Sequence, residues 1–340
     1  MSTLTDQRQS LFQTLRTEVR DHLRLRDVTS DRMQDRGHRS LVWDATHQPT
    51  GSHYFPVYVE LFETLERRGE IDPDRHFIVE TTTGNAGAAA AHVADRLGYD
   101  ILIFMPENMP DGRIEDVRSY LGPRSELQFT EEGTYVSGMV RHLKRFLAAH
   151  RDGYRGKELY AMDHSRRSES VRAIRSATDV LLDERLAPNA TVDACVLALG
   201  NGTTFSGVGQ AARERFPDAT LVGVEPAESP WFYVQKYGEE LLRENYGIEP
   251  EGHQHDLLGT GGWGVEFPNL DLDFPDEIAL VFGQEWRCML DRLHDDGYPV
   301  GHSSAACQWI IEKQSAAAAL SDNDAMTFLG IFYDPIEKYQ

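Results

Sequence analysis

The sequence is poor in lysine, in cysteine and in long apolar runs. Only five of its 340 residues are lysines, so arginine carries most of the positive charge. Against 34 basic residues stand 55 acidic ones, which gives a formal net charge of −21. Such a chain repels nucleic-acid phosphates and anionic membranes, so we expect neither as a partner. The same charge would suit a salt-rich cytoplasm, where self-repulsion is screened.

The three cysteines, Cys195, Cys288 and Cys307, are too few and too far apart for a disulfide framework, which favours a reducing compartment. No run approaches the roughly 20 apolar residues of a membrane span. Residues 1–27 are charged and helix-periodic, without the apolar block of a signal peptide. We therefore expect a cytoplasmic protein. No metal site is expected, because the His-Gln-His segment at 253–255 lacks further ligands at suitable spacing.

Short β-rich runs alternate with helical patterns along most of the chain. The strand-like runs, some with the turn that follows, are 76–85, 100–106, 125–130, 193–200 and 219–226, and the helix-like runs are 86–98, 115–122, 135–150, 168–186 and 204–216. This alternation predicts an α/β fold with two open, mostly parallel sheets, helices on both faces and an active cleft between two domains. We expect a smaller domain over 37–150 and a larger one formed by 1–36 and 151–340.

The segment LALGNGTTFSGVG contains the strongest local signal for a ligand. A buried strand ends at Gly200, Gly202 follows, and two threonines precede a helix. Backbone N–H groups, two hydroxyls and a helix N-terminus together suit a phosphate. A dinucleotide fingerprint fits only in part: Gly200, Gly202 and Glu225 match it, but its third glycine position holds the bulky Phe205. Dinucleotide binding and a glycine-rich turn without a ligand are the alternatives.

A second glycine-containing turn, TTTGNAG at residues 81–87, also lies between a strand and the start of a helix. Its N–H groups at the positive end of the helix dipole suit a carboxylate, and Asn85 adds an amide donor. A simple N-cap cluster is the competing interpretation.

Seven motifs occur in one order: QPTGSH, TTGNAG, MPENMP, GNGTT, VGVEPAESP, GTGGWG and GHSSAA. This order resembles the cysteine synthase and tryptophan synthase β-subunit group, the fold-type II pyridoxal-phosphate (PLP) enzymes, over about residues 41–339. The resemblance implies lyase or transferase chemistry of the β-elimination or β-replacement type. It also implies a small amino acid or related acid as the ligand, and a homodimer.

The resemblance assigns roles residue by residue. The substrate carboxylate would be bound by Thr82, Thr83, Gly84, Asn85 and Ala86, with Asn85 also touching the 3′-oxygen of the cofactor. The phosphate would be bound by Gly200, Asn201, Gly202, Thr203 and Thr204. Gly259, in GTGGWG, would pass near the cofactor ring.

The chain departs from the family pattern at its most important position. The pattern P-T-G-S-x-K-D-R predicts the Schiff-base lysine at position 54, where this chain has Tyr54, followed by Phe55 and Pro56. A phenol cannot condense with an aldehyde, so PLP cannot be bound covalently there. None of the five lysines stands in a recognisable cofactor motif.

Two further departures concern the cofactor ring and the substrate. Asp334 is expected near the pyridine nitrogen, where relatives place Ser or Thr, and an aspartate would keep that nitrogen protonated. The glutamine that helps cysteine synthases to hold substrate is absent, and Met162, Asp163 and His164 stand in its neighbourhood.

Three hypotheses account for Tyr54. In the first, PLP or a similar phosphate-bearing cofactor is held non-covalently and Tyr54 or His53 moves the proton. A phenol with a pKa near roughly 10 is a poor base at neutral pH, whereas a histidine titrates close to it. In the second, the pocket serves another phosphate-bearing ligand in a reaction without PLP. In the third, the chain is a catalytically inactive relative that binds a metabolite or a partner enzyme.

Overall fold

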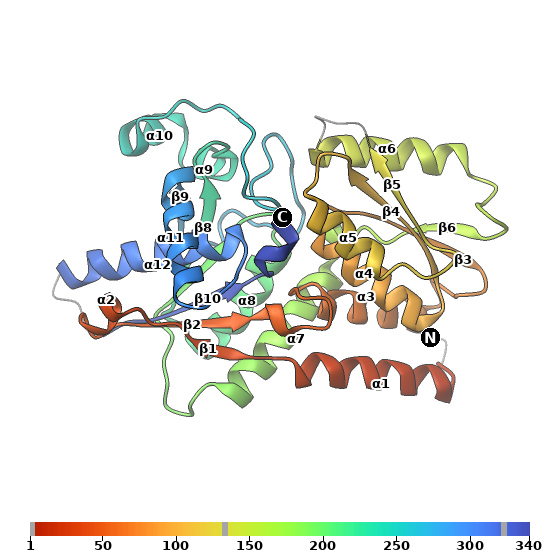
Figure 1. Cartoon of the computed structure of the whole chain (residues 1–340), viewed down its shortest axis with the longest axis horizontal. Helices are drawn as coiled ribbons and strands as arrows, with labels where there is room; N and C mark the ends of the chain where they lie inside the picture. The colour runs from red at the N-terminus through yellow and green to blue at the C-terminus, as the bar shows by residue number, and fades with distance from the viewer. Residues whose placement is uncertain (1–3, 131–134, 321–324) are drawn as a thin grey trace. The chain divides into compact units, whose positions relative to one another are not determined.

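The computed structural model describes residues 4–130, 135–320 and 325–340. The chain forms two compact units, each built around one sheet (Figure 1). Unit 1 comprises Met1–His22, His47–Ala173 and Glu337–Gln340, and unit 2 comprises Leu23–Thr46 and Ile174–Ile336. The chain crosses from one unit to the other between His22 and Leu23, and again within η1 (Ala45–His47), α7 (Ser168–Arg185) and η3 (Ile336–Tyr339).

Unit 1 holds a four-stranded parallel sheet with the strand order β5-β4-β3-β6. Its strands are β3 (His76–Thr81), β4 (Asp100–Pro106), β5 (Glu126–Thr130) and β6 (Glu158–Ala161). Its helices are α1 (Asp6–Asp21), α3 (Phe55–Arg68), α4 (Asn85–Leu97), α5 (Asp111–Ser119), α6 (Tyr135–Ala149) and the short η2 (His164–Arg166).

Side chains along β3 and β4 point alternately to the two faces of this sheet, so each face can pack against a helix. Phe77 and Val79 lie with Phe104 on one face, where Phe146 of α6 packs against them. The residues between them point to the opposite face, which the alanine-rich α4 covers. Figure 1 shows α6 and α4 on opposite sides of the strands. Gly98 ends α4 in the left-handed conformation, as predicted from the sequence.

Unit 2 holds a mixed six-stranded sheet with the order β1-β2-β10-β7-β8-β9, in which only β1 is antiparallel to its neighbour. Its strands are β1 (Leu25–Asp27), β2 (Arg39–Asp44), β7 (Ala194–Ala198), β8 (Thr220–Pro226), β9 (Glu277–Val281) and β10 (Thr327–Phe332). Its helices are α2 (Asp31–Gln34), α8 (Thr203–Arg215), α9 (Trp231–Tyr237), α10 (Glu239–Tyr246), α11 (Gly283–Asp295) and α12 (His302–Leu320).

The core of unit 2 joins segments that are distant in sequence. Val42 of β2 and Phe332 of β10 pack against Met289 of α11 and Ala305 of α12. On α8, a Cβ added at Gly209 would lie 3.0 Å from Leu221 of β8, so glycine lets this helix approach the sheet closely.

The α/β fold predicted from the sequence is confirmed, but the unit boundaries differ from the predicted ones. Residues 39–44 form β2, which pairs with β10 of unit 2, whereas 37–150 is the range expected for the smaller domain. At the other end, β6 extends unit 1 past position 150 because it pairs with β3. In the described ranges, every helix is too short or too polar to cross a membrane.

Candidate functional site

In unit 1, the turn before α3 presents Tyr54 as the N-cap residue of that helix. Gly51 adopts φ +60°, and its N–H donates to the carbonyl oxygen of Gln48 at 2.7 Å, which closes the turn. Pro56 follows within the first helical turn, where its missing N–H costs no hydrogen bond. The Tyr54 ring is half-buried, and the His53 ring is buried beside it with centroids 4.4 Å apart.

The 82–86 segment runs from the end of β3 into the first turn of α4, and one hydroxyl group organises it. Oγ1 of Thr82 accepts hydrogen bonds from the N–H groups of Gly84 and Gly87, each at 2.9 Å. Gly84 has φ +140°, a conformation that favours glycine. No acidic residue stands in the first turn of α4, so its positive dipole end is not offset there by a carboxylate of its own.

Lys338 is a buried lysine in the same unit, next to these two segments. Its Nζ donates to the carbonyl oxygen of Thr50 at 2.8 Å and to Oδ1 of Asn85 at 3.2 Å. It also pairs with Oδ2 of Asp116 at 2.7 Å. Three acceptors satisfy the three N–H bonds of an ammonium. Because an ammonium only donates, the oxygen of the Asn85 amide must face Lys338 and its NH₂ group must face away.

Arg113 is a second buried cation at this end of unit 1, with 2% of its surface exposed. Its Nη1 donates to the carbonyl oxygen of Thr83 at 2.9 Å, and its guanidinium lies 4.6 Å from the centroid of the Tyr339 ring. Its side chain also fills the space that a Cβ on Gly84 would need. Arg113 thus adds positive charge beside the 82–86 segment, whereas the charge of Lys338 is offset by Asp116.

Sequence reasoning missed both cations. Lys338 stands in no cofactor motif, and it contacts Asn85 across 253 positions of sequence. Arg113 follows a proline-rich stretch that gives no indication of burial. Of the predicted residues in unit 1, the structure brings His53 next to Tyr54 and groups Thr82, Thr83, Gly84, Asn85 and Ala86 in one bend.

In unit 2, residues 200–204 run from the turn after β7 into the first turn of α8. Oδ1 of Asn201 accepts the N–H of Thr203 at 3.0 Å, and Gly202 is the N-cap residue with φ +83°. A Cβ on Gly202 would lie 2.6 Å from the backbone nitrogen of Leu270, so only glycine fits. The bend is thus held tightly by its own residues and by the segment around Leu270.

The start of α8 is rich in hydrogen-bond donors. The side chains of Thr203 and Thr204 are buried, and the first turn contains no acidic residue. Over the described ranges, the backbone N–H groups of Thr204 and Phe205 donate no hydrogen bond, as is usual in the first turn of a helix. Hydroxyls and unsatisfied N–H groups at a helix N-terminus are suited to binding a phosphate.

The other two predicted residues of unit 2 lie near the same edge of its sheet. Gly200 approaches Gly259 so closely that a Cβ on Gly200 would overlap the Gly259 carbonyl oxygen. Asp334 follows β10, which pairs in parallel with β7, so the segments after both strands emerge at one edge. The Asp334 side chain is 1% exposed. Within the described ranges, no group of three or more His, Cys, Asp or Glu side chains could hold a metal ion.

Comparison with curated proteins finds cysteine synthases among the relatives of this chain. It is 28% identical to a cysteine synthase of Staphylococcus aureus over 239 residues, which cover 70% of this chain and 68% of that protein. It is also 28% identical to a probable cysteine synthase of Bacillus subtilis over 266 residues, or 78% of each chain.

Solved structures share the fold at lower sequence identity. A hydrogen sulfide-producing enzyme from Fusobacterium nucleatum superposes with a TM-score of 0.78 at 21% identity, covering 95% of this chain and 99% of that one. A lysine-to-alanine variant of O-ureido-L-serine synthase, bound to O-ureido-L-serine, gives a TM-score of 0.76 at 19% identity, covering 94% and 91% of the two chains.

The family model described as pyridoxal-phosphate dependent enzyme matches residues 27–329, which is most of the chain. The match includes β2 to β9, the start of β10 and both glycine-containing bends. This protein therefore belongs to the family of pyridoxal-phosphate dependent enzymes.

Proposed function

We propose that this protein binds PLP without a covalent bond at position 54. We also propose that it catalyses β-elimination or β-replacement on a small amino acid or a related acid. Membership of the family implies PLP as the cofactor. The observation that carries the proposal is the bend at 200–204, which combines buried hydroxyls, unsatisfied N–H groups and a helix N-terminus. The binding is proposed to be non-covalent because position 54 is a tyrosine.

The donor set in unit 2 fits the cofactor. Gly202, Thr203 and Thr204 would hold the phosphate, and Gly259 would lie along the ring. Asp334 is a buried carboxylate suited to a protonated pyridine nitrogen. When bound, PLP withdraws electrons from the α-carbon of an amino acid, which is the chemistry that these reactions require.

The bend at 82–86 would bind the carboxylate of the substrate. Its first helical turn lacks acidic residues, and the cations Arg113 and Lys338 lie beside it. Lys338 holds the oxygen of the Asn85 amide, so the NH₂ group of Asn85 faces away from Lys338. Among solved structures, the lysine-to-alanine variant of O-ureido-L-serine synthase holds O-ureido-L-serine. This fold is thus compatible with amino-acid binding when a lysine has been removed.

The absence of lysine at position 54 has a chemical consequence. Besides holding the cofactor, a lysine at this position would be the natural base for the α-proton, and here another side chain must move that proton. Tyr54 and His53 are the candidates at the position itself.

The experiment is to measure PLP binding by equilibrium dialysis, followed by borohydride reduction and peptide mass mapping. We expect saturable binding to the wild type with no reduced adduct on any lysine, and an adduct at position 54 in the Tyr54→Lys variant. Treating Tyr54→Phe in parallel controls for loss of the phenol. No saturable binding, or an adduct on a native lysine such as Lys338, would contradict the non-covalent mode.

Binding assays with other phosphate compounds and turnover assays distinguish the two alternative hypotheses. Saturable binding of another phosphate compound in place of PLP would favour an enzyme that uses the pocket without PLP. Binding without turnover of any β-substituted amino acid would favour a catalytically inactive relative. We also propose a homodimer, which sedimentation equilibrium tests directly.

A further inference from the structure

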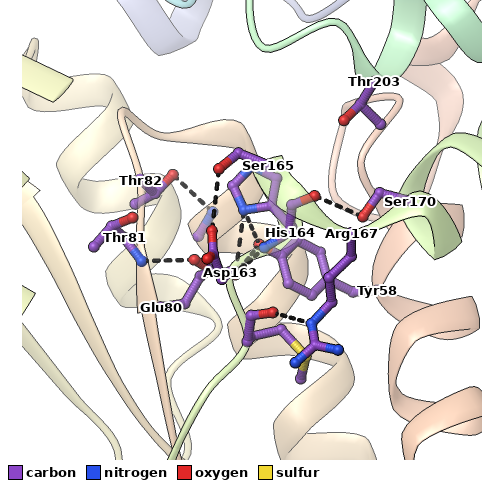
Figure 2. A network of polar contacts seen from close by, with 12 residues as sticks. Tyr58, Glu80, Thr81, Thr82, Asp163, His164, Ser165, Arg167, Ser170 and Thr203 are labelled. Carbon is purple, nitrogen blue, oxygen red and sulfur yellow. Dashed lines mark hydrogen bonds and ion pairs between the residues drawn. The ribbon is translucent and has the colours of Figure 1, made fainter. Parts of the chain in front are cut away.

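The hydroxyl group of Thr203 is the first side-chain donor of α8. Thr203 follows directly after the N-cap residue Gly202, and its side chain is labelled in Figure 2. Side chains of a helix tilt toward its N-terminus, which is the end where the proposed function places the phosphate. The Thr203 side chain is 0% exposed. A buried hydroxyl group needs hydrogen-bond partners, either within the protein or from a bound group.

Two asparagine side chains contact the polar groups of Thr203. The backbone N–H of Thr203 donates to Oδ1 of Asn201 at 3.0 Å. Its hydroxyl oxygen accepts a hydrogen bond from Nδ2 of Asn269 at 3.1 Å. These contacts use the backbone N–H and a lone pair of the hydroxyl oxygen, but not the hydroxyl proton. In the part of the chain that the structure describes, no acceptor takes that proton.

The backbone around Asn269 is attached to the start of α8 independently of the Asn269 amide. The carbonyl oxygen of Asn269 accepts the hydroxyl of Ser206 at 2.6 Å. The N–H of the next residue, Leu270, donates to the carbonyl oxygen of Phe267 at 3.0 Å and closes a turn. The same turn lies against Gly202, where an added Cβ would be 2.7 Å from the carbonyl carbon of Asn269. The Asn269 amide is therefore held beside Thr203 by contacts other than its own hydrogen bond.

We propose that Asn269 is a positioning residue for the phosphate site. Its NH₂ group can only donate, so it holds the Thr203 hydroxyl oxygen as an acceptor and leaves the hydroxyl proton for the bound group. The N–H groups of Thr204 and Phe205 are donors as well. Three donors at a helix N-terminus match a fully ionised phosphate, whose peripheral oxygens only accept hydrogen bonds. This inference rests on the proposed function, which assigns the phosphate to this bend.

Replacing Asn269→Asp reverses the polarity of the contact and keeps the shape of the side chain. An ionised carboxylate only accepts hydrogen bonds, so it should take the Thr203 proton and leave only lone pairs of the hydroxyl for the phosphate. The new negative charge would also repel the phosphate. Thr203→Val separates these two effects, because it removes the hydroxyl group while the charge at position 269 stays.

The experiment is a double-mutant cycle on the dissociation constant of inorganic phosphate, measured by calorimetric titration at pH 8. We expect Asn269→Asp to weaken binding about tenfold more with Thr203 present than in the Thr203→Val background, because hydrogen bonds to charged groups are among the strong ones. Thr203→Ser keeps the hydroxyl and should keep this difference. Asn245→Asp is the matched control, because the Asn245 amide also donates to a hydroxyl, that of Tyr233 at 3.0 Å. It should change phosphate binding by less than about twofold.

A second cycle with Asn269→Leu introduces no charge and covers the case in which Asn269→Asp does not fold. It should weaken phosphate binding with Thr203 present and have no further effect in the Thr203→Val background. Equal losses in the two backgrounds, in either cycle, would overturn the inference, because Asn269 would then act through its charge or its place in the fold and not through the hydroxyl.

The PLP binding assay separates this inference from the proposed function. If inorganic phosphate binds with the expected coupling and PLP does not bind, the role of Asn269 stands and the proposed function fails. If PLP binds and the coupling is absent, the proposed function stands and the role of Asn269 is wrong. If the wild type binds neither compound, both are wrong.

Discussion

Nζ of Lys338 and Oδ1 of Asn85 lie 3.2 Å apart, and the contact is buried. It joins the start of α4 to residues 337–340, which belong to unit 1 although the segment before them belongs to unit 2. The same ammonium pairs with Asp116 and donates to the Thr50 carbonyl oxygen. One side chain thus holds three separate segments of unit 1 together.

Replacing Lys338→Met should lower the free energy of unfolding by about 2–3 kcal/mol, because it removes charge-assisted hydrogen bonds and leaves the carboxylate of Asp116 without its cation. Urea denaturation followed by circular dichroism measures this. Lys313→Met, at a more exposed position on α12, is the matched control and should change stability by less than about 0.5 kcal/mol. Equal effects of the two substitutions would contradict the role of Lys338.

Replacing Gly202→Ala should destabilise the protein more than Gly247→Ala does. Both glycines adopt the left-handed conformation, with φ +83° and ψ −18° at Gly202 and φ +67° and ψ +25° at Gly247, so both substitutions introduce backbone strain of about 1 kcal/mol. Only at Gly202 would the new methyl group also meet the backbone of Leu270, whereas nothing lies within 4 Å at Gly247. We expect an additional loss of about 1–3 kcal/mol and weaker phosphate binding. Parallel denaturation curves and inorganic phosphate titrations test this, and equal losses would refute it.

Glu225 should make stability depend on pH. The carboxyl group is buried at the end of β8, where it accepts the N–H groups of Phe232 at 2.9 Å and Tyr233 at 3.0 Å. Burial raises its pKa from 4.5 to about 8 despite these hydrogen bonds. Between these two pKa values the native state holds a proton that the unfolded state has released. The free energy of unfolding should therefore fall as pH rises through this window, by at most about 1.4 kcal/mol per pH unit.

The Glu225→Gln variant isolates this contribution, because glutamine does not titrate. Urea denaturation of both proteins from pH 5 to pH 9 should show wild-type stability declining relative to the variant as pH increases. A constant difference across the range would show that Glu225 has an ordinary pKa in the native state.

The three thiols should differ sharply in reactivity. Cys288 is exposed, whereas Cys195 and Cys307 are buried and burial raises the pKa of each to about 12. Because the thiolate is the reactive form, Ellman's reagent should titrate one thiol rapidly in the native protein and all three in denaturant. Cys288→Ser should abolish the rapid phase. A second fast thiol in the native protein would show that the core opens more readily than the structure indicates.

The parts of the fold that follow local rules could be predicted from the sequence. The turn after β3, the alanine-rich α4 and its terminating Gly98 all have signals within a few residues. The sheet of unit 2 could not be predicted in the same way, because β2 pairs with β10 through residues such as Arg39 and Thr327. Periodicity identifies a strand but not its neighbour, so sequence patterns alone place residues 39–44 in the wrong unit.

In the candidate site, too, some features have a local sequence signal and others depend on tertiary contacts. The bends at 82–86 and 200–204 are continuous in sequence, and their glycines indicate close backbone approach by residue type alone. Arg113 and Lys338 reach the first bend through tertiary contacts that no spacing predicts. Sequence patterns mark His164 only as a neighbour of the missing glutamine, and its contact with Glu80 (Figure 2) depends on the pairing of β3 with β6.

The return of residues 337–340 to unit 1 has a consequence for how the protein is made. On the ribosome, the start of α4 emerges long before its buried ammonium partner has been translated. Unit 1 therefore lacks Lys338 until all of unit 2 has been synthesised. Completion of unit 1 is thus coupled to synthesis of unit 2, and a truncation before Lys338 would impair unit 1 although Asn85 and Asp116 precede most of unit 2 in the sequence.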